Sequence, residues 1–277
     1  IKVAIVGWRG MVGSVLMDRM QQEDDLNDVE AYLFSTSLNG KPNTDFPECH
    51  DLIMDSNSLE QLWEMDIIIT CQGSGYSKDI HPKLRDSGWE GYWIDSASAF
   101  RMKEDATIVL DPVNKNQLER AIENGQKDFI GGNCTVSVML MALGGLFEED
   151  LIEWLSAHTY QAASGAGAKE MIELLDQSHF LTSAYIDEQN PAKSALAYEK
   201  VLVEQMRSEE IPREQFGRSL AFSLFPWIDR KMDTGQSREE WKAQAEANKI
   251  LGSSSIIPVD GTCVRIGSLR CHAEAFT

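Results

Sequence analysis

The sequence lacks the features that mark membrane, secreted and metal-binding proteins. No apolar run reaches the roughly 20 residues of a membrane span, and no charged-then-apolar leader precedes the first predicted strand. The five cysteines are an odd number without C-x-x-C spacing, so neither a disulfide framework nor a zinc site is indicated. We therefore expect a cytoplasmic protein with no membrane partner and no bound metal.

Basic residues are scarce as well. The 277 residues include 25 Lys and Arg against 44 Asp and Glu, which gives a formal net charge of −19. A field of this sign repels nucleic acid, so we expect no nucleic-acid partner, and an anionic substrate needs a locally basic pocket. Hydrophobic residues make up 43% of the chain, which is enough for one large or two ordinary globular domains.

Internal repeats and low-complexity segments are also missing. The chain begins at Ile1 without a methionine and stops at Thr277, within a stretch that reads as a strand. We interpret this as a truncation at the C-terminus. We expect the chain by itself to be poorly stable and inactive, because its last strand ends without the elements that should cover it, and the activities predicted here therefore concern an intact form.

The N-terminal stretch reads as a strand, a glycine turn and a helix. The strand is Lys2 to Val6 and the helix runs from Ser14 to Gln21. Glycines between them let the backbone approach a pyrophosphate, which then rests on the helix N-terminus. The G-x-x-G-x-x-G spacing departs from the common G-x-G-x-x-G, but its place directly after the first strand predicts a dinucleotide site formed by Gly7, Arg9, Gly10, Met11, Val12 and Gly13.

The second predicted strand, Val29 to Phe34, points to the type of dinucleotide. An NAD enzyme carries an Asp or Glu after this strand to bind the ribose 2′-hydroxyl, whereas this chain has Ser35, Thr36 and Ser37. Three hydroxyls together with Arg9 suit a 2′-phosphate, so we predict NADP. The alternative is that the three are only turn residues.

Further strands are predicted at Asp66 to Thr70, Gly91 to Ile94 and Thr107 to Leu110, the period of a doubly wound α/β domain. Ligands bind at the carboxyl ends of such strands, so we expect the cofactor to contact Gln72, Gly73 and Ser98. Arg101 comes next and is either a solvated surface charge or an anion clamp.

The stretch Phe129 to Ser137 reads as a strand, two glycines, a cysteine and a helix. Cys134 opens an apolar run that extends to Phe147. At a helix N-terminus the backbone N–H groups and the helix dipole favour a thiolate, and the same groups can hold an oxyanion. A free cysteine is more often a small buried hydrophobe, but the glycines and the polar Asn133 beside it favour a nucleophile.

After Cys134 the pattern changes to that of an α+β domain, so we expect a dinucleotide-binding domain over 1–131 and a second domain over 132–277. Thr159 to Gly167 ends a strand in a glycine-rich loop before a helix. Ser237 to Glu240 is a capping box that opens a helix to about Leu251. It places Glu239 and Lys242 on one face, where the simplest reading is a surface ion pair.

The stretch Gly261 to His272 reads as one alternating strand. Arg265 and His272 then face opposite sides, unless a bulge near Gly267 intervenes. A lone histidine in a strand is usually structural. Of the five histidines, however, His272 is the best candidate for the acid or base that a nucleophilic cysteine needs.

Five motifs in this order resemble the bacterial type of aspartate-semialdehyde dehydrogenase, over essentially the whole chain: Gly7 to Gly13, Gly131 to Ser137, Tyr160 to Gly165, Glu239 to Lys242 and Val264 to His272. The resemblance implies a Rossmann-like NADP-binding domain, an α+β catalytic and dimerisation domain, and a homodimer. It implies that Cys134 is the acyl-forming nucleophile and His272 the acid/base. The substrate-binding roles that it implies are orientation by Gln161, with Asn133 nearby, carboxylate binding by Arg265, amino-group binding by Glu239, and phosphate binding by Arg101 and Lys242. We add Ser164 and Gly165 to the cofactor site.

The expected reaction interconverts L-aspartate 4-semialdehyde plus phosphate with 4-aspartyl phosphate through a cysteine thioester. The resemblance places it in diaminopimelate, lysine, methionine and threonine biosynthesis. Two related enzymes remain alternatives. N-acetyl-glutamyl-phosphate reductase is disfavoured by the acidic Glu239, and glyceraldehyde-3-phosphate dehydrogenase by the absence of an acid at Ser35 to Ser37. A catalytically silent dinucleotide-binding regulatory protein is the alternative that is not an enzyme.

Overall fold

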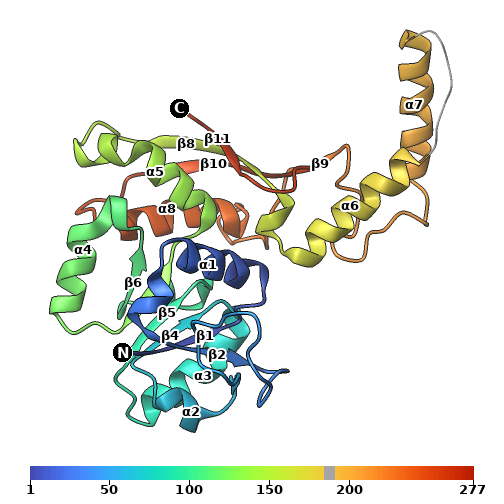
Figure 1. Cartoon of the computed structure of the whole chain (residues 1–277). Coiled ribbons are helices and arrows are strands. Elements are labelled where there is room, and N and C mark those ends of the chain that lie inside the picture. Colours follow the sequence, from blue (N-terminus) through green and yellow to red (C-terminus); the bar gives the residue numbers. More distant parts are fainter. Residues whose placement is uncertain (184–190) are drawn as a thin grey trace. The chain divides into compact units, whose positions relative to one another are not determined.

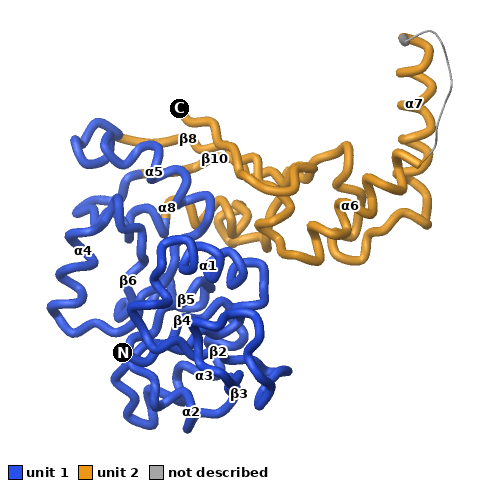
Figure 2. The backbone as a smooth tube through the Cα atoms, in the orientation of Figure 1, with its two compact units in different colours: residues 1–152, 245–257 blue, residues 153–244, 258–277 orange. Residues whose placement is uncertain are grey.

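The computed structural model describes residues 1–183 and 191–277 (Figure 1). The chain divides into two compact units (Figure 2). Unit 1 comprises Ile1–Ile152 and Ala245–Ile257, and unit 2 comprises Glu153–Gln244 and Pro258–Thr277. The boundary expected between residues 131 and 132 does not coincide with a boundary between these compact units, and the two predicted domains stay a prediction.

Unit 1 is built on a seven-stranded sheet in the order β3-β2-β1-β4-β5-β7-β6, in which every neighbouring pair is parallel. The strands are β1 (Lys2–Val6), β2 (Glu30–Ser35), β3 (Met54–Asp55), β4 (Ile67–Thr70), β5 (Tyr92–Asp95), β6 (Ala106–Val109) and β7 (Asp128–Gly131). The connecting helices are α1 (Met11–Gln22), α2 (Leu59–Trp63), α3 (Ser74–Asp86), α4 (Asp111–Glu123) and α5 (Cys134–Glu148), with short 3-10 turns η1 (Asp25–Asp28) and η2 (Ser98–Phe100). This is the predicted Rossmann-like architecture, which is confirmed.

Both faces of this sheet are covered, which explains why its strands are apolar without alternation. Along β1, Val3 and Ile5 belong to one hydrophobic cluster and Ala4 and Val6 to another. Because successive strand residues point to opposite faces, one short run supplies two cores. All the parallel strands end at the same edge, so the segments that follow β1, β4, β5 and β7 gather there.

The glycine turn after β1 depends on the absence of side chains. Gly7 has a φ of 77°, and a Cβ there would lie 2.8 Å from the carbonyl carbon of Cys71. A Cβ on Gly13 would lie 2.2 Å from the Gly7 oxygen. The first turn of α1 therefore packs directly on the loop, and the backbone at the start of α1 is left accessible to a phosphate group.

Unit 2 contains a mixed four-stranded sheet in the order β11-β8-β10-β9. Its strands are β8 (Leu155–Gln161), β9 (Leu224–Phe225), β10 (Val259–Ile266) and β11 (Ala273–Phe276). β8 and β10 are parallel, and the other two pairs are antiparallel. The helices are α6 (Ala168–Thr182), α7 (Pro191–Met206) and the first turns of α8 (Arg238–Leu251), with the 3-10 turn η3 (Ala163–Gly165). The α+β class predicted for this part is confirmed.

The single strand predicted over Gly261 to His272 is wrong. β10 ends at Ile266, and the chain then crosses the end of β8, where the Ser268 and Leu269 oxygens accept the N–H groups of Ala163 and Ser164. It continues as β11 on the other edge of β8. The alternation of side chains along the sequence continues through this crossing, so pattern alone could not reveal it.

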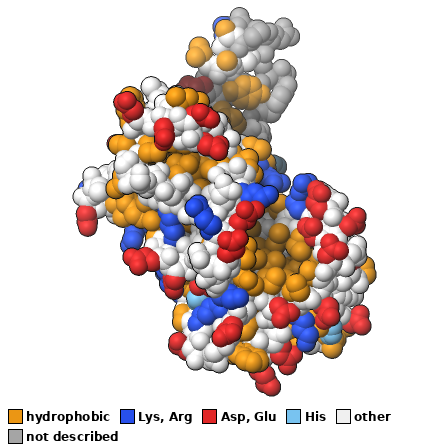
Figure 3. All heavy atoms as spheres, turned by 90° about the vertical axis from the view of Figure 1, so that its left-hand side faces the viewer, with side chains coloured by type: hydrophobic (Ala, Val, Ile, Leu, Met, Phe, Trp, Pro, Cys, Tyr) orange, Lys and Arg blue, Asp and Glu red, His pale blue; other side chains and the backbone are white. Residues whose placement is uncertain are grey.

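Acidic side chains lie at many separate places on one face of the molecule (Figure 3). On the face drawn in Figure 3, carboxylates are distributed among lysines, arginines and exposed hydrophobic side chains rather than gathered in one patch. None of the helices in the described part of the chain combines the length and apolar character that crossing a membrane requires.

Candidate active site

Cys134 is the first residue of α5, as predicted, and its side chain is exposed. Several of the residues that follow it in the helix are buried: Thr135, Val136, Met139 and Leu140. Cys134 lies at this helix start because β7 ends at Gly131 and the chain enters the helix only three residues later. Cys134 is thus presented at the same sheet edge as the glycine turn.

Asn133 caps α5 and is itself buried. Its Oδ1 accepts the backbone N–H groups of Thr135 (3.0 Å) and Val136 (3.1 Å), and the Thr135 hydroxyl at 2.6 Å. The cap therefore occupies two of the backbone donors that were expected to hold an oxyanion. An oxyanion at this site needs at least one other donor.

The remaining cysteines are less suited to nucleophilic chemistry. Burial is the main cause that raises the pKa of Cys49 to about 11 and of Cys263 to about 12. Burial also raises the pKa of Cys71, against a hydrogen bond with Ser96 that lowers it. Cys271 is exposed, but it lies in the crossing before β11 and not at a helix start.

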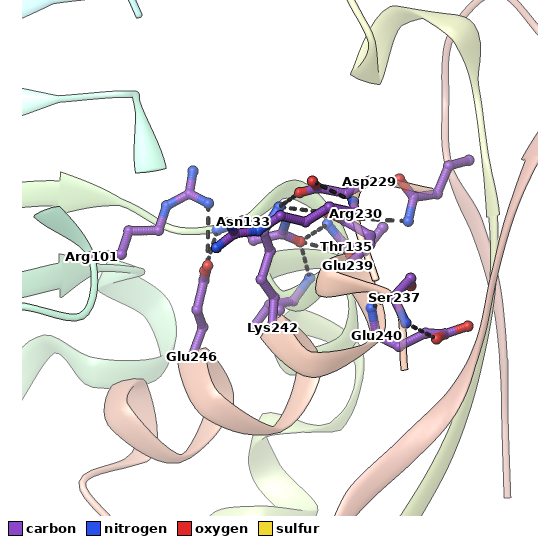
Figure 4. Close-up of polar contacts among 12 residues, drawn as sticks. Arg101, Asn133, Thr135, Asp229, Arg230, Ser237, Glu239, Glu240, Lys242 and Glu246 are labelled. Atoms are coloured by element: carbon purple, nitrogen blue, oxygen red, sulfur yellow. Dashed lines mark hydrogen bonds and ion pairs between the residues drawn. The ribbon is translucent and has the colours of Figure 1, made fainter. Parts of the chain in front are cut away.

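Arg101 is not a surface charge, because its side chain is buried. Its Nε donates to the Gly131 oxygen at 2.7 Å and its Nη2 to the Ser96 oxygen at 3.3 Å. Its Nη1 donates to Glu246 at 3.3 Å. The guanidinium therefore lies beside the turn that leads to Cys134 (Figure 4). Of the two readings left open by the sequence, the solvated charge is excluded.

The turn Ala162 to Gly165, at the end of β8, brings Arg265 and His272 together within unit 2. Arg265 Nη1 donates to the Ala162 oxygen at 2.6 Å, and the Ala162 N–H donates to His272 Nδ1 at 3.0 Å. A Cβ on Gly165 would lie 2.9 Å from Arg265 Nη1 and 3.1 Å from His272 Cε1. Gly165 thus makes room for both side chains. Arg265 reaches this turn from β10, and His272 reaches it from the segment between β10 and β11.

The protonation of His272 follows from its surroundings. Burial lowers its pKa, the nearby Arg265 lowers it further, and Glu239 opposes both. A backbone N–H can only donate, so Nδ1 is an acceptor and the neutral ring carries its proton on Nε2. His272 is thereby prepared to donate from Nε2 at neutral pH.

Gln161, Glu239 and Lys242 form a connected polar group in unit 2. Gln161 Nε2 donates to the Thr159 hydroxyl at 3.0 Å and to Glu239 at 3.4 Å. Lys242 bridges Glu239 (2.7 Å) and Asp229 (3.4 Å), as Figure 4 shows. Burial raises the pKa of Asp229, but the Arg230 N–H and the Lys242 charge outweigh it and lower the pKa overall. Glu239 is buried, so the simple surface pair is excluded.

The capping box that opens α8 is confirmed. The Ser237 N–H donates to Glu240 Oε2 at 2.7 Å, and the Glu240 N–H donates to Ser237 Oγ at 3.2 Å. Glu240 Oε1 also accepts the Cys263 N–H at 3.3 Å, which ties the helix to β10. This anchoring fixes the direction of α8 and hence the face that carries Glu239 and Lys242.

The residues assigned to the cofactor lie mainly at the carboxyl edge of the parallel sheet. Arg9 Nη2 donates to Ser37 Oγ at 2.8 Å and to Ser35 Oγ at 3.4 Å. This side chain cluster carries hydroxyls and a cation, with Thr36 exposed between the two serines. The other members from unit 1 begin helices or follow strands: Gly7, Gly10, Met11, Val12, Gly13, Gln72, Gly73 and Ser98. Ser164 and Gly165 belong to unit 2.

Two acidic residues near the site were missed by the sequence reading. Glu246 binds both Arg101 and the Asn133 N–H, and Asp229 binds Lys242. Neither shows a local signal in a chain so rich in acids. One pattern could have pointed to Glu246: it follows Glu239 by seven residues, which places both on the same face of the predicted helix. Within residues 1–183 and 191–277 no three His, Cys, Asp or Glu side chains gather as metal ligands do.

Comparison with known proteins gives matches along almost all of the chain. The NAD-binding domain of semialdehyde dehydrogenases matches residues 2–121, and their dimerisation domain matches residues 143–277. The solved aspartate semialdehyde dehydrogenase from Francisella tularensis is 49% identical, with a TM-score of 0.94 over 100% of this chain and 75% of that one.

More distant solved structures share the architecture. An aspartate semialdehyde dehydrogenase II from Vibrio cholerae, complexed with ASA, is 27% identical, with a TM-score of 0.77 over 99% of this chain and 73% of that one. One with NADP from Candida albicans is 16% identical, with a TM-score of 0.59 over 100% of this chain and 70% of that one, and shares the fold.

Proposed function

The chain belongs to the aspartate-semialdehyde dehydrogenase family, and on this premise we propose that it interconverts L-aspartate 4-semialdehyde plus phosphate with 4-aspartyl phosphate, using NADP. The observation that carries the proposal is the exposed thiol of Cys134 at the start of α5. It lies at the edge of the sheet where the glycine turn of the dinucleotide domain lies. The family consists of enzymes, so the catalytically silent alternative is not retained.

Cys134 supplies the nucleophile. Its thiolate attacks the aldehyde carbon, which forms a C–S bond and leaves an oxyanion. The glycine turn after β1 and the cluster of Arg9, Ser35 and Ser37 would hold NADP, which would supply the acceptor for the hydride that leaves this carbon. A phosphate oxygen then attacks the resulting thioester, the C–S bond breaks, and the thiolate is restored as the acyl phosphate leaves.

His272 is proposed as the acid/base, acting from Nε2. Its Nδ1 accepts the Ala162 N–H, so the neutral ring can donate a hydrogen bond from Nε2–H to the oxyanion, and the proton stays on the ring when the hydride leaves. Asn133 and Gln161 are proposed to orient the substrate. Arg265, which contacts the same turn as His272, is assigned to the substrate carboxylate.

Glu239 is assigned to the substrate amino group, and this assignment separates the proposed substrate from its acylated alternative. A buried carboxylate stabilises an ammonium ion, whereas the amide of an N-acetyl group carries no charge to pair with it. The test is phosphate-dependent NADPH formation with L-aspartate 4-semialdehyde and with N-acetylglutamate semialdehyde. If only N-acetylglutamate semialdehyde were turned over, the proposed substrate would be wrong.

Arg9 with Ser35 and Ser37 supports NADP over NAD. Ser37→Asp places a carboxylate next to Arg9, where it pairs with the guanidinium and repels a 2′-phosphate. We expect kcat/KM for NADPH to fall by roughly tenfold or more, the value of one charge-assisted hydrogen bond. Activity with NADH should be kept. Arg9→Gln should likewise reduce only the NADPH value, and a wild type that already prefers NADH would contradict the assignment.

Lys242 and Arg101 are proposed to bind phosphate, each as a cation in a strongly acidic chain. We expect Lys242→Leu to raise the phosphate KM roughly tenfold to a hundredfold, as for a lost bond of about 1.5–3 kcal/mol. Arg101→Lys should act in the same direction, because it keeps the charge and loses the guanidinium fork.

The matched control for Lys242 is Lys83→Leu. Lys83 pairs with Asp79 on the surface, so its removal should leave both KM values unchanged. If Lys242→Leu raised the aldehyde KM and left the phosphate KM unchanged, the assignments would be reversed: Lys242 would bind the aldehyde substrate, and phosphate would bind at the site assigned to its carboxylate.

We also propose that the enzyme works as a cytoplasmic homodimer in the biosynthesis of diaminopimelate, lysine, methionine and threonine. The match to a dimerisation domain over 143–277 supports the dimer. The pathway rests on the proposed substrate, because the family resemblance places its reaction in these biosyntheses.

A further inference from the structure

Glu246 is a buried carboxylate for which the proposed chemistry has no role yet. It lies on the part of α8 that belongs to unit 1, and only 2% of its surface is exposed. Its Oε1 accepts Arg101 Nη1 at 3.3 Å, and its Oε2 accepts the Asn133 N–H at 2.9 Å. One carboxylate thus connects the buried cation with the residue before Cys134 (Figure 4).

A carboxylate is a costly choice for this position. Removing its charge from water is repaid only when partners satisfy both oxygens, and a neutral side chain of similar size would fill the space at lower cost. Both oxygens are satisfied here, one by a charged donor and one by a backbone donor. The arrangement therefore points to a geometric role rather than to simple packing.

The hydrogen bond from the Asn133 N–H to Glu246 connects the start of α5 to another helix, α8. Asn133 Oδ1 holds the N–H groups of Thr135 and Val136, which orients the helix relative to the cap. The Glu246 bond holds the N–H of the cap residue itself. With both sides of Asn133 bound, little backbone freedom remains for the next residue, Cys134.

The same part of α8 also fixes Arg101. Lys249, three residues after Glu246, donates from Nζ to the Arg101 oxygen at 2.6 Å and to the Lys103 oxygen. Arg101 Nε donates to the Gly131 oxygen, one residue before the glycine that precedes Asn133. Arg101 is therefore held through its backbone by Lys249 and through its side chain by Glu246 and Gly131.

We propose that Glu246 is a positioning residue for the thioester step. By binding the Asn133 N–H and the Arg101 guanidinium, it fixes the position of the Cys134 sulfur relative to Arg101. The proposal rests on the proposed function of Cys134. Glu246 touches neither substrate nor cofactor in this role. It acts through the backbone of Asn133 and through the guanidinium.

The test is Glu246→Gln, assayed by rapid mixing with NADP and L-aspartate 4-semialdehyde in the absence of phosphate. Without phosphate the thioester accumulates, so the amplitude of the NADPH burst counts active thiols and its rate reports their attack and the hydride step. A misplacement of about 1 Å can cost roughly 10²-fold in rate. We expect a burst of wild-type amplitude with a rate roughly tenfold to a hundredfold lower, and an unchanged Kd for NADP.

The matched control is Asp128→Asn. Asp128 is a second buried carboxylate of unit 1, at the amino end of β7, where it binds His81 at 2.7 Å and Arg85 at 2.5 Å. Its loss should lower the thermal stability and leave the burst rate of the folded enzyme at the wild-type value. Glu246→Asp, which keeps the charge and is too short to reach both partners, replaces Glu246→Gln if the latter does not fold, and the same slow burst is expected.

The outcomes are separable. A Glu246 variant with a wild-type burst rate, at full or at reduced amplitude, would overturn the positioning role, because a purely structural residue changes only how many molecules are active. Absence of the burst in the wild type would instead contradict the proposed function of Cys134.

Discussion

Replacing Cys134 with alanine is expected to abolish turnover while NADP binding is retained. Without the sulfur there is no thioester, and no other described cysteine lies at a helix start facing the carboxyl edge of the parallel sheet. The glycine turn and the Arg9 cluster, which are proposed to hold the cofactor, do not depend on this side chain. Initial rates of NADPH formation and a fluorescence titration with NADPH measure the two properties.

Cys271→Ser is the matched control, because Cys271 is the other exposed cysteine. It should retain activity. Full activity of Cys134→Ala together with inactivity of Cys271→Ser would show that Cys271, and not Cys134, is the nucleophile.

Replacing His272 with alanine is expected to lower kcat by roughly 10² to 10⁴-fold, the usual contribution of a positioned acid or base. The side chain of Asn133 occupies the backbone N–H groups of Thr135 and Val136, so these two donors do not stabilise the oxyanion. The proposed hydrogen bond from His272 Nε2 therefore matters more. Glutamine can place an N–H near the position of Nε2, and His272→Gln should therefore recover part of the lost rate. A marginal effect of His272→Ala would show that another group provides the proton.

The pH dependence follows from the lowered pKa of His272. Burial and the charge of Arg265 keep the ring neutral at pH values where an ordinary histidine, with a pKa of about 6.5, would begin to be protonated. Protonation would place an Nδ1–H against the Ala162 N–H and break that bond. We expect kcat/KM to fall on the acid side with a midpoint below pH 6.5, and the residual activity of His272→Ala to lack this limb. A midpoint above that value in the wild type would contradict the assignment.

Much of the first unit could be predicted from local sequence. Short β-branched strands, glycine turns and the acid-free end of β2 are local signals, and they placed the dinucleotide domain and the Arg9 cluster. The helix start at Cys134 was also readable, since a strand, two glycines and an apolar run adjoin one another. Such features depend on residues that are neighbours in the chain.

What could not be predicted depends on residues that are distant in the chain. Glu246 and Asn133 are 113 residues apart, and Glu246 is one acid among 44. The break after Ile266 was hidden because the crossing keeps the alternation of a strand. Arg101 looked as much like a surface charge as a buried one, because its partners at Ser96, Gly131 and Glu246 become visible only when the sheet is assembled.

The central claim is that the acyl group passes through Cys134. It is tested most directly by incubating the enzyme with NADP and L-aspartate 4-semialdehyde without phosphate, followed by acid quenching and peptide mass spectrometry. We predict one aspartyl group on the peptide that contains Cys134, formed in step with one equivalent of NADPH and lost when phosphate is added before the quench. NADPH formation with an unmodified Cys134 peptide, or with the acyl group on another residue, would contradict the account.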